Sequence, residues 1–454
     1  MLYMTAMVRA SLIVQRIFSF WHSSRSLIAF SAAVTGAALL AARVAHSVRG
    51  DDSYAYVMFG FVLIGTALLL AYIRWGRMPD SFFGWSILLI PVLVIALQPA
   101  YLSADLYDYI SCARHAWRGE NIYHIACNVS QTKVYAYGPL FLIVSMVPAL
   151  GDLLVAGSSV YFFKLLLFII YLASVRLIYL FLRARGDGDR AARCTLAYGW
   201  HAAILLESLQ SGHNDVLVVL LLLLALFAYD RGARAWAVLA LWAAGLIKLF
   251  PLLLIPFVLF FPRITPSRNG TRFRHRVSVT LLILTVLALG GLTYWRGFDF
   301  FHTIYSLPYE AYPVGYGVVP FLVYSFLTLA HFERMLALTH AHWTGVALIV
   351  MISWWGYFRA WRSPWRPENG FALLVTALLL CTSHWLVPWY LLWWYPLLIL
   401  SFGHLRIDLI VLLIAFLGGL SMVIPVSAAI LLVFGSFAAF QFGTVLLRRF
   451  HFSV

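Results

Sequence analysis

Residues 82–128 read "FFGWSILLIPVLVIALQPA" (82–100) followed by "YLSADLYDYISCARHAWRGENIYHIACN" (101–128), and the class of the protein can be inferred from this change in composition. The first part is an uninterrupted apolar run of about 20 residues, the length that crosses a hydrocarbon core. The second part sets down acids, arginines and tyrosines at once. The change predicts a membrane span that opens into a polar, functional segment outside the bilayer.

The composition of the whole chain extends this interpretation. The protein is 63% hydrophobic and 11% charged, against roughly 45–50% and 25% for soluble domains. Its mean hydropathy is +0.89, and apolar runs of crossing length recur throughout. We therefore expect an all-α polytopic membrane protein with a single integral domain over 1–454. Within it we expect an N-terminal segment with two extra spans (1–80), a core (80–405) and a C-terminal helical hairpin (406–454).

Apolar periodicity and loop charge predict about 14 crossings of the membrane. Two apolar segments, 139–150 and 317–332, are interpreted as re-entrant or interfacial helices, because the first is short and the second keeps the loops on alternating sides. The predicted spans lie near 26–45, 54–73, 82–100, 158–182, 194–209, 216–229, a two-helix hairpin within 235–261, 277–294, 343–358, 370–386, 390–402, 407–423 and 427–447.

The net charge of +15 is explained by topology and not by a nucleic-acid partner. Most of the 32 Lys and Arg residues fall in short loops that the positive-inside rule assigns to the cytoplasm. This assignment places both termini in the cytoplasm and the loop 101–137 outside. The expected partner of the charge is anionic lipid at the bilayer surface.

Two carboxylates begin the polar segment. Asp105 and Asp108 are spaced i, i+3, which places them on one face of a helix. Partial desolvation at the membrane boundary raises the proton affinity of a carboxylate and suits a general base. The alternative is a pair of solvated acids that form ion pairs with Arg114 or Arg118, and the sequence leaves both open.

A second polar cluster, "SGHND", separates two apolar spans. Asn214 or Asp215 could serve as a helix cap, which needs one such residue. Three consecutive polar side chains, with His213, favour a functional role.

Lysine is used at three positions only, Lys133, Lys164 and Lys248. For Lys164, near the outer end of a span, we expect the side chain to reach the surface. Lys248 lies in "IKLFP", where Pro251 must interrupt the hairpin. Irregular backbone at membrane depth lines a cavity, so Lys248 is expected to face a pocket and bind an anion such as a lipid phosphate.

Two further features stay open. The aromatic segments "YSLPYEAYPVGYG" (305–317) and "HWLVPWYLLWWYP" (384–396) fit either an interfacial belt or sugar-stacking rings. Cys112 and Cys127 share one outward loop and could form a disulfide in an oxidising compartment. Unpaired thiols are slightly favoured, because nothing in the sequence sets the distance between the two cysteines.

Several motifs, in order, resemble the GT-C superfamily of membrane glycosyltransferases, and in particular its bacterial polyprenol-phosphate-mannose-dependent mannosyltransferases. They are "DLYDYI" (105–110), "GENIY" (119–123), "YGPL" (137–140), "GHND" (212–215), "KLFP" (248–251) and "PWY" (388–390). The resemblance covers roughly 80–405. The chain departs from it where the family's Asn-Pro is Asn121-Ile122, and where the acids read D-x-x-D instead of the D-x-D of some members.

The resemblance implies a GT-C-like bundle with an extracytoplasmic first loop, and a role for each matching residue. Asp105 would be the catalytic base, and Lys248 with Arg114 would bind the donor phosphate. Asp108, His213, Asn214 and Asp215 would shape the acceptor site or supply a second acid. Sugar or lipid contacts would come from Tyr107, Tyr137, Tyr309, Tyr312, His384, Trp389 and Tyr390. No cofactor is required, no metal ligand is assigned, and a divalent metal stays an open alternative.

The resulting expectation is an inverting transfer of a hexose from a polyprenyl-phosphate donor to a glycan or glycolipid acceptor. Mannose is the expected hexose. The reaction would take place on the extracytoplasmic face of a bacterial inner membrane. The alternative is a secondary transporter or a flippase of lipid-linked sugars. Transporters place ionisable residues near the bilayer midplane, whereas most acids here gather at the outer mouth.

Overall fold

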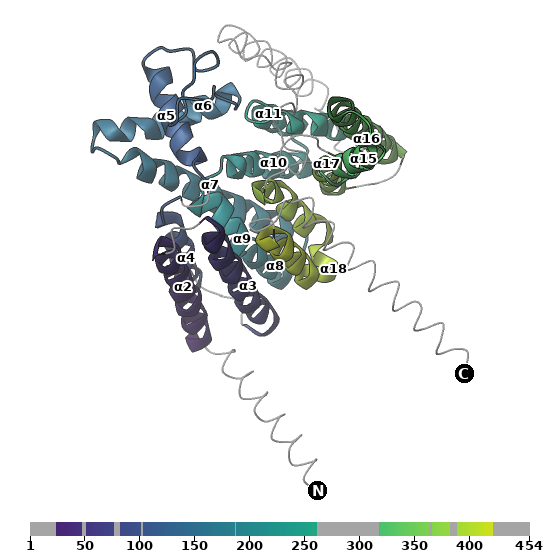
Figure 1. Ribbon diagram of the computed structural model, residues 1–454. Helices are drawn as coiled ribbons and strands as arrows, with labels where there is room; N and C mark the ends of the chain where they lie inside the picture. Colours follow the sequence, from purple (N-terminus) through teal and green to yellow (C-terminus); the bar gives the residue numbers. More distant parts are fainter. Residues whose placement is uncertain are drawn as a thin grey trace.

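The computed structural model describes residues 24–47, 51–76, 82–100, 103–186, 188–260, 317–362, 366–381 and 388–420. Every regular element in these ranges is a helix (Figure 1). Helices satisfy their backbone hydrogen bonds internally, as a segment that crosses lipid must. The predicted all-helical class is confirmed.

Three described helices are long and apolar enough to cross a bilayer: Tyr54–Trp75 within α3 (Asp51–Trp75), α7 (Ser159–Arg183) and α16 (Arg334–Arg362). A fourth span would come from Ala202–Gln210 and Asp215–Asp230 taken together, although the chain bends by 112° between them. The predicted spans 277–294 and 427–447 lie outside the described residues. The described chain is thus consistent with a helical membrane protein, and the number of crossings stays a prediction.

The N-terminal helices pack as a group beside the rest of the bundle (Figure 1). α2 (Ser24–Ser47) contacts both α3 and α4 (Phe82–Leu97). Phe30 of α2 stacks on Tyr72 of α3 with 4.6 Å between ring centroids. Gln98, just after α4, donates to the carbonyl of Ala38 at 3.0 Å. The end of α4 is thereby held in place, and the polar segment begins from it.

The predicted span 194–209 is wrong in its start and its continuity. Helix α8 (Gly188–Gly199) begins earlier than predicted and is followed by a break at Trp200–His201. After the break come α9 (Ala202–Leu205) and the π-helix η2 (Leu206–Gln210). Tyrosine hydroxyls stabilise the break, because Tyr395 donates to the carbonyl of Ala197 at 2.9 Å and Tyr171 to that of Tyr198 at 3.2 Å. Buried carbonyls that lose helical partners need such donors.

The predicted interruption at "IKLFP" is confirmed. Helix α11 (Arg234–Gly245) ends before Lys248, and the 3₁₀ helix η3 (Phe250–Leu254) and α12 (Ile255–Phe260) follow it. Pro251 stands at the start of η3, where its missing N–H costs nothing.

Two short helices cover one end of the bundle (Figure 1). They are α5 (Asp105–Trp117) and α6 (Pro139–Ala149), which continues into η1 (Leu150–Leu153). The prediction that 139–150 is too short to cross is confirmed. The amide of Gly138 donates to the carbonyl of Ile247 at 3.2 Å, and a Cβ on Gly138 would lie 1.9 Å from the carbonyl oxygen of Leu246. Only glycine lets the start of α6 approach the break beside Lys248 so closely.

The C-terminal part contains α15 (Val318–Leu329), α16, α17 (Pro367–Cys381), η5 (Pro388–Tyr390) and α18 (Leu391–Leu420). The prediction of two spans, 390–402 and 407–423, separated by a cytoplasmic turn is wrong. α18 is a single helix across that turn and across the predicted core boundary at 405. His404, Arg406 and Asp408 are polar and favour a turn between two spans, but none of these residue types breaks a helix.

An ion cluster joins three helices at the end of the bundle opposite α5. Arg185, just after α7, contacts Glu368 of α17 at 2.5 Å and Asp230 of α10 (Asp215–Asp230) at 3.3 Å. The Glu368 side chain is almost fully buried. A buried carboxylate needs such a partner, so this cluster is interpreted as structural.

Candidate functional site

Asp105 begins α5, and its carboxylate faces the interior of the bundle. The hydroxyl of Tyr137 donates to its Oδ2 at 3.2 Å, and the hydroxyl of Tyr109 lies 3.3 Å from the same oxygen. The side chain keeps 28% of its surface exposed. Asp105 therefore has oriented donors on one side and access for a reactant on the other.

His213 lies between two carboxylates. Its Nδ1 is 3.4 Å from Oδ2 of Asp105, and its Nε2 is 3.3 Å from Oε2 of Glu207. These are ion-pair distances without the alignment of a hydrogen bond. The imidazole ring is fully buried and stacks on Trp389, with 3.8 Å between the ring centroids. Segments far apart in the sequence thus meet at this ring.

Asp105 and His213 shift each other's pKa. Burial alone would lower the pKa of His213, but its interactions with Asp105 and Glu207 outweigh that effect and raise the pKa to about 9. Burial alone would raise the pKa of Asp105, but His213, Tyr137 and Lys248 outweigh it and hold that pKa below its ordinary value. The expectation that desolvation raises the proton affinity of this carboxylate is therefore wrong, because cationic and hydroxyl partners surround it. At neutral pH the site therefore contains an imidazolium beside an ionised carboxylate.

Lys248 forms the second ion pair of the site. Its ammonium donates to Oδ1 of Asp215 at 2.7 Å, and the carboxylate of Asp215 is fully buried. Three aromatic rings surround the ammonium at 4.9–5.7 Å from their centroids: Tyr390, Trp393 and Tyr137. Such cation–π contacts favour a desolvated cation.

Buried polar atoms without a hydrogen-bond partner gather next to this pair. They are both side-chain polar atoms of Asn214 and Oδ2 of Asp215. Neither side chain caps α10, so the helix-cap interpretation of these two residues is wrong. In the described part of the chain these atoms supply one donor and two acceptors that a bound hydroxyl or a water molecule could satisfy.

The site carries a small net negative charge. Its carboxylates are Asp105, Glu207 and Asp215, and its cations are His213 and Lys248. With the imidazolium protonated, one negative charge is left over. The cluster as a whole is suited to stabilise positive charge that develops on a reactant.

Several predicted site residues lie away from the cluster. Asp108 accepts a hydrogen bond from the amide of Val129 at 2.9 Å, so it holds the loop over α5. Arg114 pairs with Asp152 of η1 and lies nine residues beyond Asp105, about 13 Å along the helix. Neither the proposed pairing of the acids with Arg114 nor a place for Arg114 beside Lys248 is found.

The remaining predicted contacts divide into three groups. Tyr107 is 37% exposed on α5, whereas Tyr137, Trp389 and Tyr390 all contact charged residues of the site. Tyr309, Tyr312 and His384 lie outside the described residues.

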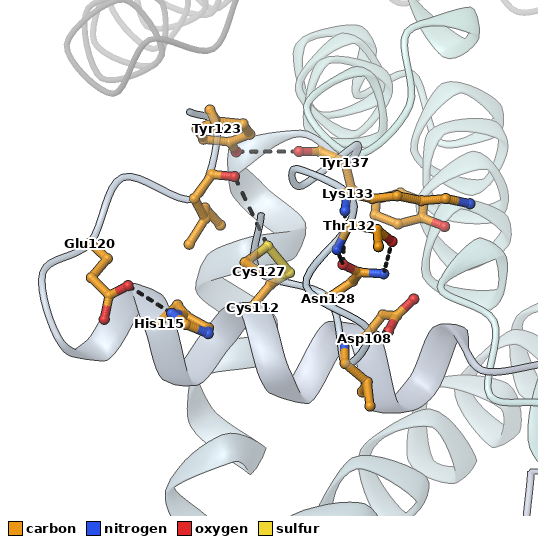
Figure 2. Close-up of a disulfide and its surroundings, with 12 residues drawn as sticks. Asp108, Cys112, His115, Glu120, Tyr123, Cys127, Asn128, Thr132, Lys133 and Tyr137 are labelled. Atoms are coloured by element: carbon orange, nitrogen blue, oxygen red, sulfur yellow. Dashed lines mark hydrogen bonds and ion pairs between the residues drawn. A yellow bond between two sulfur atoms is a disulfide. The ribbon is translucent and has the colours of Figure 1, made fainter. Parts of the chain in front are cut away.

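A disulfide joins Cys112 of α5 to Cys127, so the slight preference for unpaired thiols is wrong (Figure 2). The cysteines are close because residues 118–127 turn back over α5, which no local sequence pattern reveals. The loop is held further by Asn128, whose Oδ1 accepts from the amides of Thr132 and Lys133 at 2.7 and 2.8 Å. The hydroxyl of Tyr123 donates to the carbonyl of Tyr137 at 3.2 Å, which ties the loop to the site (Figure 2).

The prediction for Lys164 is wrong, and one residue of the site, Glu207, was not predicted. Lys164 does not reach the surface: it is 3% exposed and donates to the carbonyls of Leu209 and Gln210, both at 2.9 Å. Glu207 was not among the predicted site residues. Its signal was present, since a carboxylate inside the apolar stretch "AAILLESLQ" is costly unless it has a function or a partner.

In the described part of the chain, no group of three His, Cys, Asp or Glu side chains is arranged to hold a metal ion. Asp105, His213 and Glu207 lie in a row, with the ring in the middle, instead of around a common point. No protein-family model, curated protein or solved structure matches the chain.

Proposed function

We propose that the protein is a membrane glycosyltransferase that transfers a hexose from a polyprenyl-phosphate donor to a hydroxyl of a glycan or glycolipid. The observation that carries the proposal is the half-open carboxylate of Asp105. It is held by Tyr137 and His213 at one end of a helical bundle, beside the Lys248–Asp215 pair. A GT-C-like arrangement of spans and interfacial helices belongs to the same proposal.

The two ends of the bundle differ in chemistry, and the difference supports an extracytoplasmic site. Disulfides persist in oxidising compartments, and the Cys112–Cys127 bridge lies on the same helix as Asp105. At the opposite end, α7 ends at Arg183 and is followed by Arg185, and α10 is followed by Arg231 and Arg234. The positive-inside rule assigns these arginines to the cytoplasm.

In the proposed reaction Asp105 accepts the proton of the acceptor hydroxyl. The hydroxyl oxygen forms a bond to the anomeric carbon while the bond from that carbon to the donor phosphate breaks. The polyprenyl phosphate leaves with the electron pair, and direct displacement inverts the anomeric centre. A positioned carboxylate base contributes about 10²–10⁴-fold to such a step.

The charges of the site favour this chemistry. Transfer between sugars passes through a transition state with positive charge on the sugar ring. The leftover negative charge of the cluster stabilises that charge, and an ammonium has two further N–H groups besides the one given to Asp215. We assign these N–H groups of Lys248 to the departing phosphate.

A transporter of lipid-linked sugars is favoured by one specific observation. The site is built from two helix interruptions, after Gln210 and after Gly245, and transporters bind their cargo at such breaks. The two functions differ in their product: an enzyme forms a new glycosidic bond, whereas a transporter moves the donor unchanged.

The test is transfer in inverted and right-side-out membrane vesicles supplied with radiolabelled polyprenyl-phosphate hexoses. We expect labelled glycan or glycolipid product with wild type and at most about 1% of that product with Asp105→Asn. Movement of intact donor without product formation, equal in both variants, would contradict the proposal and support transport.

A further inference from the structure

Glu207 contacts the His213 ring on the side away from Asp105. It lies in the π-helix η2, and its side chain is 7% exposed. Its carboxylate meets His213 at Nε2, whereas Asp105 meets the same ring at Nδ1. A single π-helical turn within helices is rare and is found mostly at functional positions.

Several contacts hold η2 in its position. The ammonium of Lys164 binds the carbonyls of Leu209 and Gln210 at the end of η2. The amide of Ser211 donates to the carbonyl of Leu206 at 2.8 Å, and the amide of His213 donates to the carbonyl of Glu207 at 3.3 Å. The carboxylate of Glu207 is therefore presented to the ring by a fixed backbone.

The surroundings of His213 contain few other charges. Asp105 approaches from α5 and Glu207 from η2, and the face of the ring is covered by the uncharged Trp389 of η5. The Lys248–Asp215 pair belongs to the same cluster, and the charge of Lys248 acts on Asp105. The two carboxylates are thus the groups that set the orientation and the charge of the ring.

We propose that Glu207 is a positioning residue that holds the His213 ring against Asp105 by binding the ring nitrogen that Asp105 does not contact. The inference rests on the proposed function and assigns the roles within it. With a carboxylate at each nitrogen, both nitrogens carry protons and the ring has no lone pair to offer. His213 is then a fixed counter-ion, and the acceptor proton goes to Asp105.

The experiment compares Glu207→Gln with Glu368→Gln in the full-length protein in vesicles. Both replace a buried, ion-paired glutamate by its neutral isostere, but Glu368 pairs with Arg185 at the opposite end. The measurement is kcat and KM for transfer from pH 5 to 10. For Glu207→Gln we expect the alkaline limb of kcat to move to lower pH by about one unit or more, because one of the two carboxylates is lost.

The expected KM for the donor is within about twofold of wild type, because Glu207 does not contact the substrate. Glu368→Gln should keep the wild-type alkaline limb. Coincident limbs for wild type and Glu207→Gln, or a change confined to KM, would overturn the inference. If Glu207→Gln does not fold, Glu207→Asp keeps the charge and should keep the limb at its wild-type position with a lower kcat; a wild-type kcat would overturn the inference.

Failure of the proposed function is recognised separately, as no product from the wild type with any donor. In that case the pH dependence of thermal unfolding in detergent still reports on the contact. Wild type should lose stability as the pH rises through about 9, and Glu207→Gln should lose it at lower pH. Identical curves would overturn the role of Glu207 whatever the function.

Discussion

The ammonium of Lys248 and the carboxylate of Asp215 are 2.7 Å apart, and this contact joins the two interruptions of the helical core. Lys248 stands after α11, and Asp215 begins α10 after the 112° bend. The site is therefore formed by residues from both interruptions, together with Asp105 from α5.

The contact predicts a strong dependence of stability on both partners. Lys248→Met or Asp215→Asn alone should lower the free energy of unfolding by about 3–5 kcal/mol, because each leaves a buried group without its counter-charge. The double variant should recover part of this loss. Thermal unfolding in detergent measures the effect, and additive losses would show that the pair is not coupled.

Asp105→Asn is expected to lower transfer by about 10²–10⁴-fold. It should also lower stability, because the buried His213 loses one of its two carboxylate partners. The matched control is Asp108→Asn, one turn further along the same helix, where the carboxylate binds the amide of Val129. That variant should keep most of the transfer. Equal losses at both positions would indicate that the helix, and not the carboxylate of Asp105, is what the substitutions disturb.

Stability and transfer should both fall at high pH. The pKa of His213 is raised from its ordinary value of 6.5 to about 9, so the imidazole binds its proton more tightly in the folded protein than in the unfolded chain. This stabilisation is fully present below pH 6.5 and is lost as the pH rises through about 9. The check is a titration of unfolding from pH 6 to 10, in which His213→Gln should remove the alkaline decline.

The disulfide predicts a defined pattern of thiol labelling. Under denaturing, non-reducing conditions a maleimide should modify only Cys194 and Cys381, and after reduction all four cysteines. Replacing Cys112 and Cys127 by serine should cost about 3 kcal/mol, since the bridge closes a loop of 15 residues. Labelling of all four cysteines before reduction would contradict the bridge.

Lys164→Met should destabilise the protein and reduce transfer together. The carbonyls of Leu209 and Gln210 would lose their donor, at a cost of about 1–3 kcal/mol each. Lys133→Met makes the same change at an exposed loop position and should leave both properties unchanged. A Lys164→Met protein as stable as that control would show that the buried ammonium is not needed to hold η2.

The sequence alone was enough for the class of the protein, for most of the helices and for several members of the site. Apolar runs report directly on the preference of a segment for an apolar environment, so α3, α7 and the interruption at Lys248 could be predicted from composition and from Pro251. The polar residues Asp105, His213 and Lys248 stood out for the same reason, because each is costly next to apolar segments.

The packing of the helices determines which of these residues meet. The contacts between Asp105 and His213, and between Lys248 and Asp215, bring together segments that local periodicity cannot pair. Glu207 joins the site through a π-helix, Arg114 leaves it because α5 carries it toward Asp152, and the two cysteines meet because a loop folds back. The reason is physical: hydropathy is a property of each segment by itself, whereas distance between charges depends on how the segments pack.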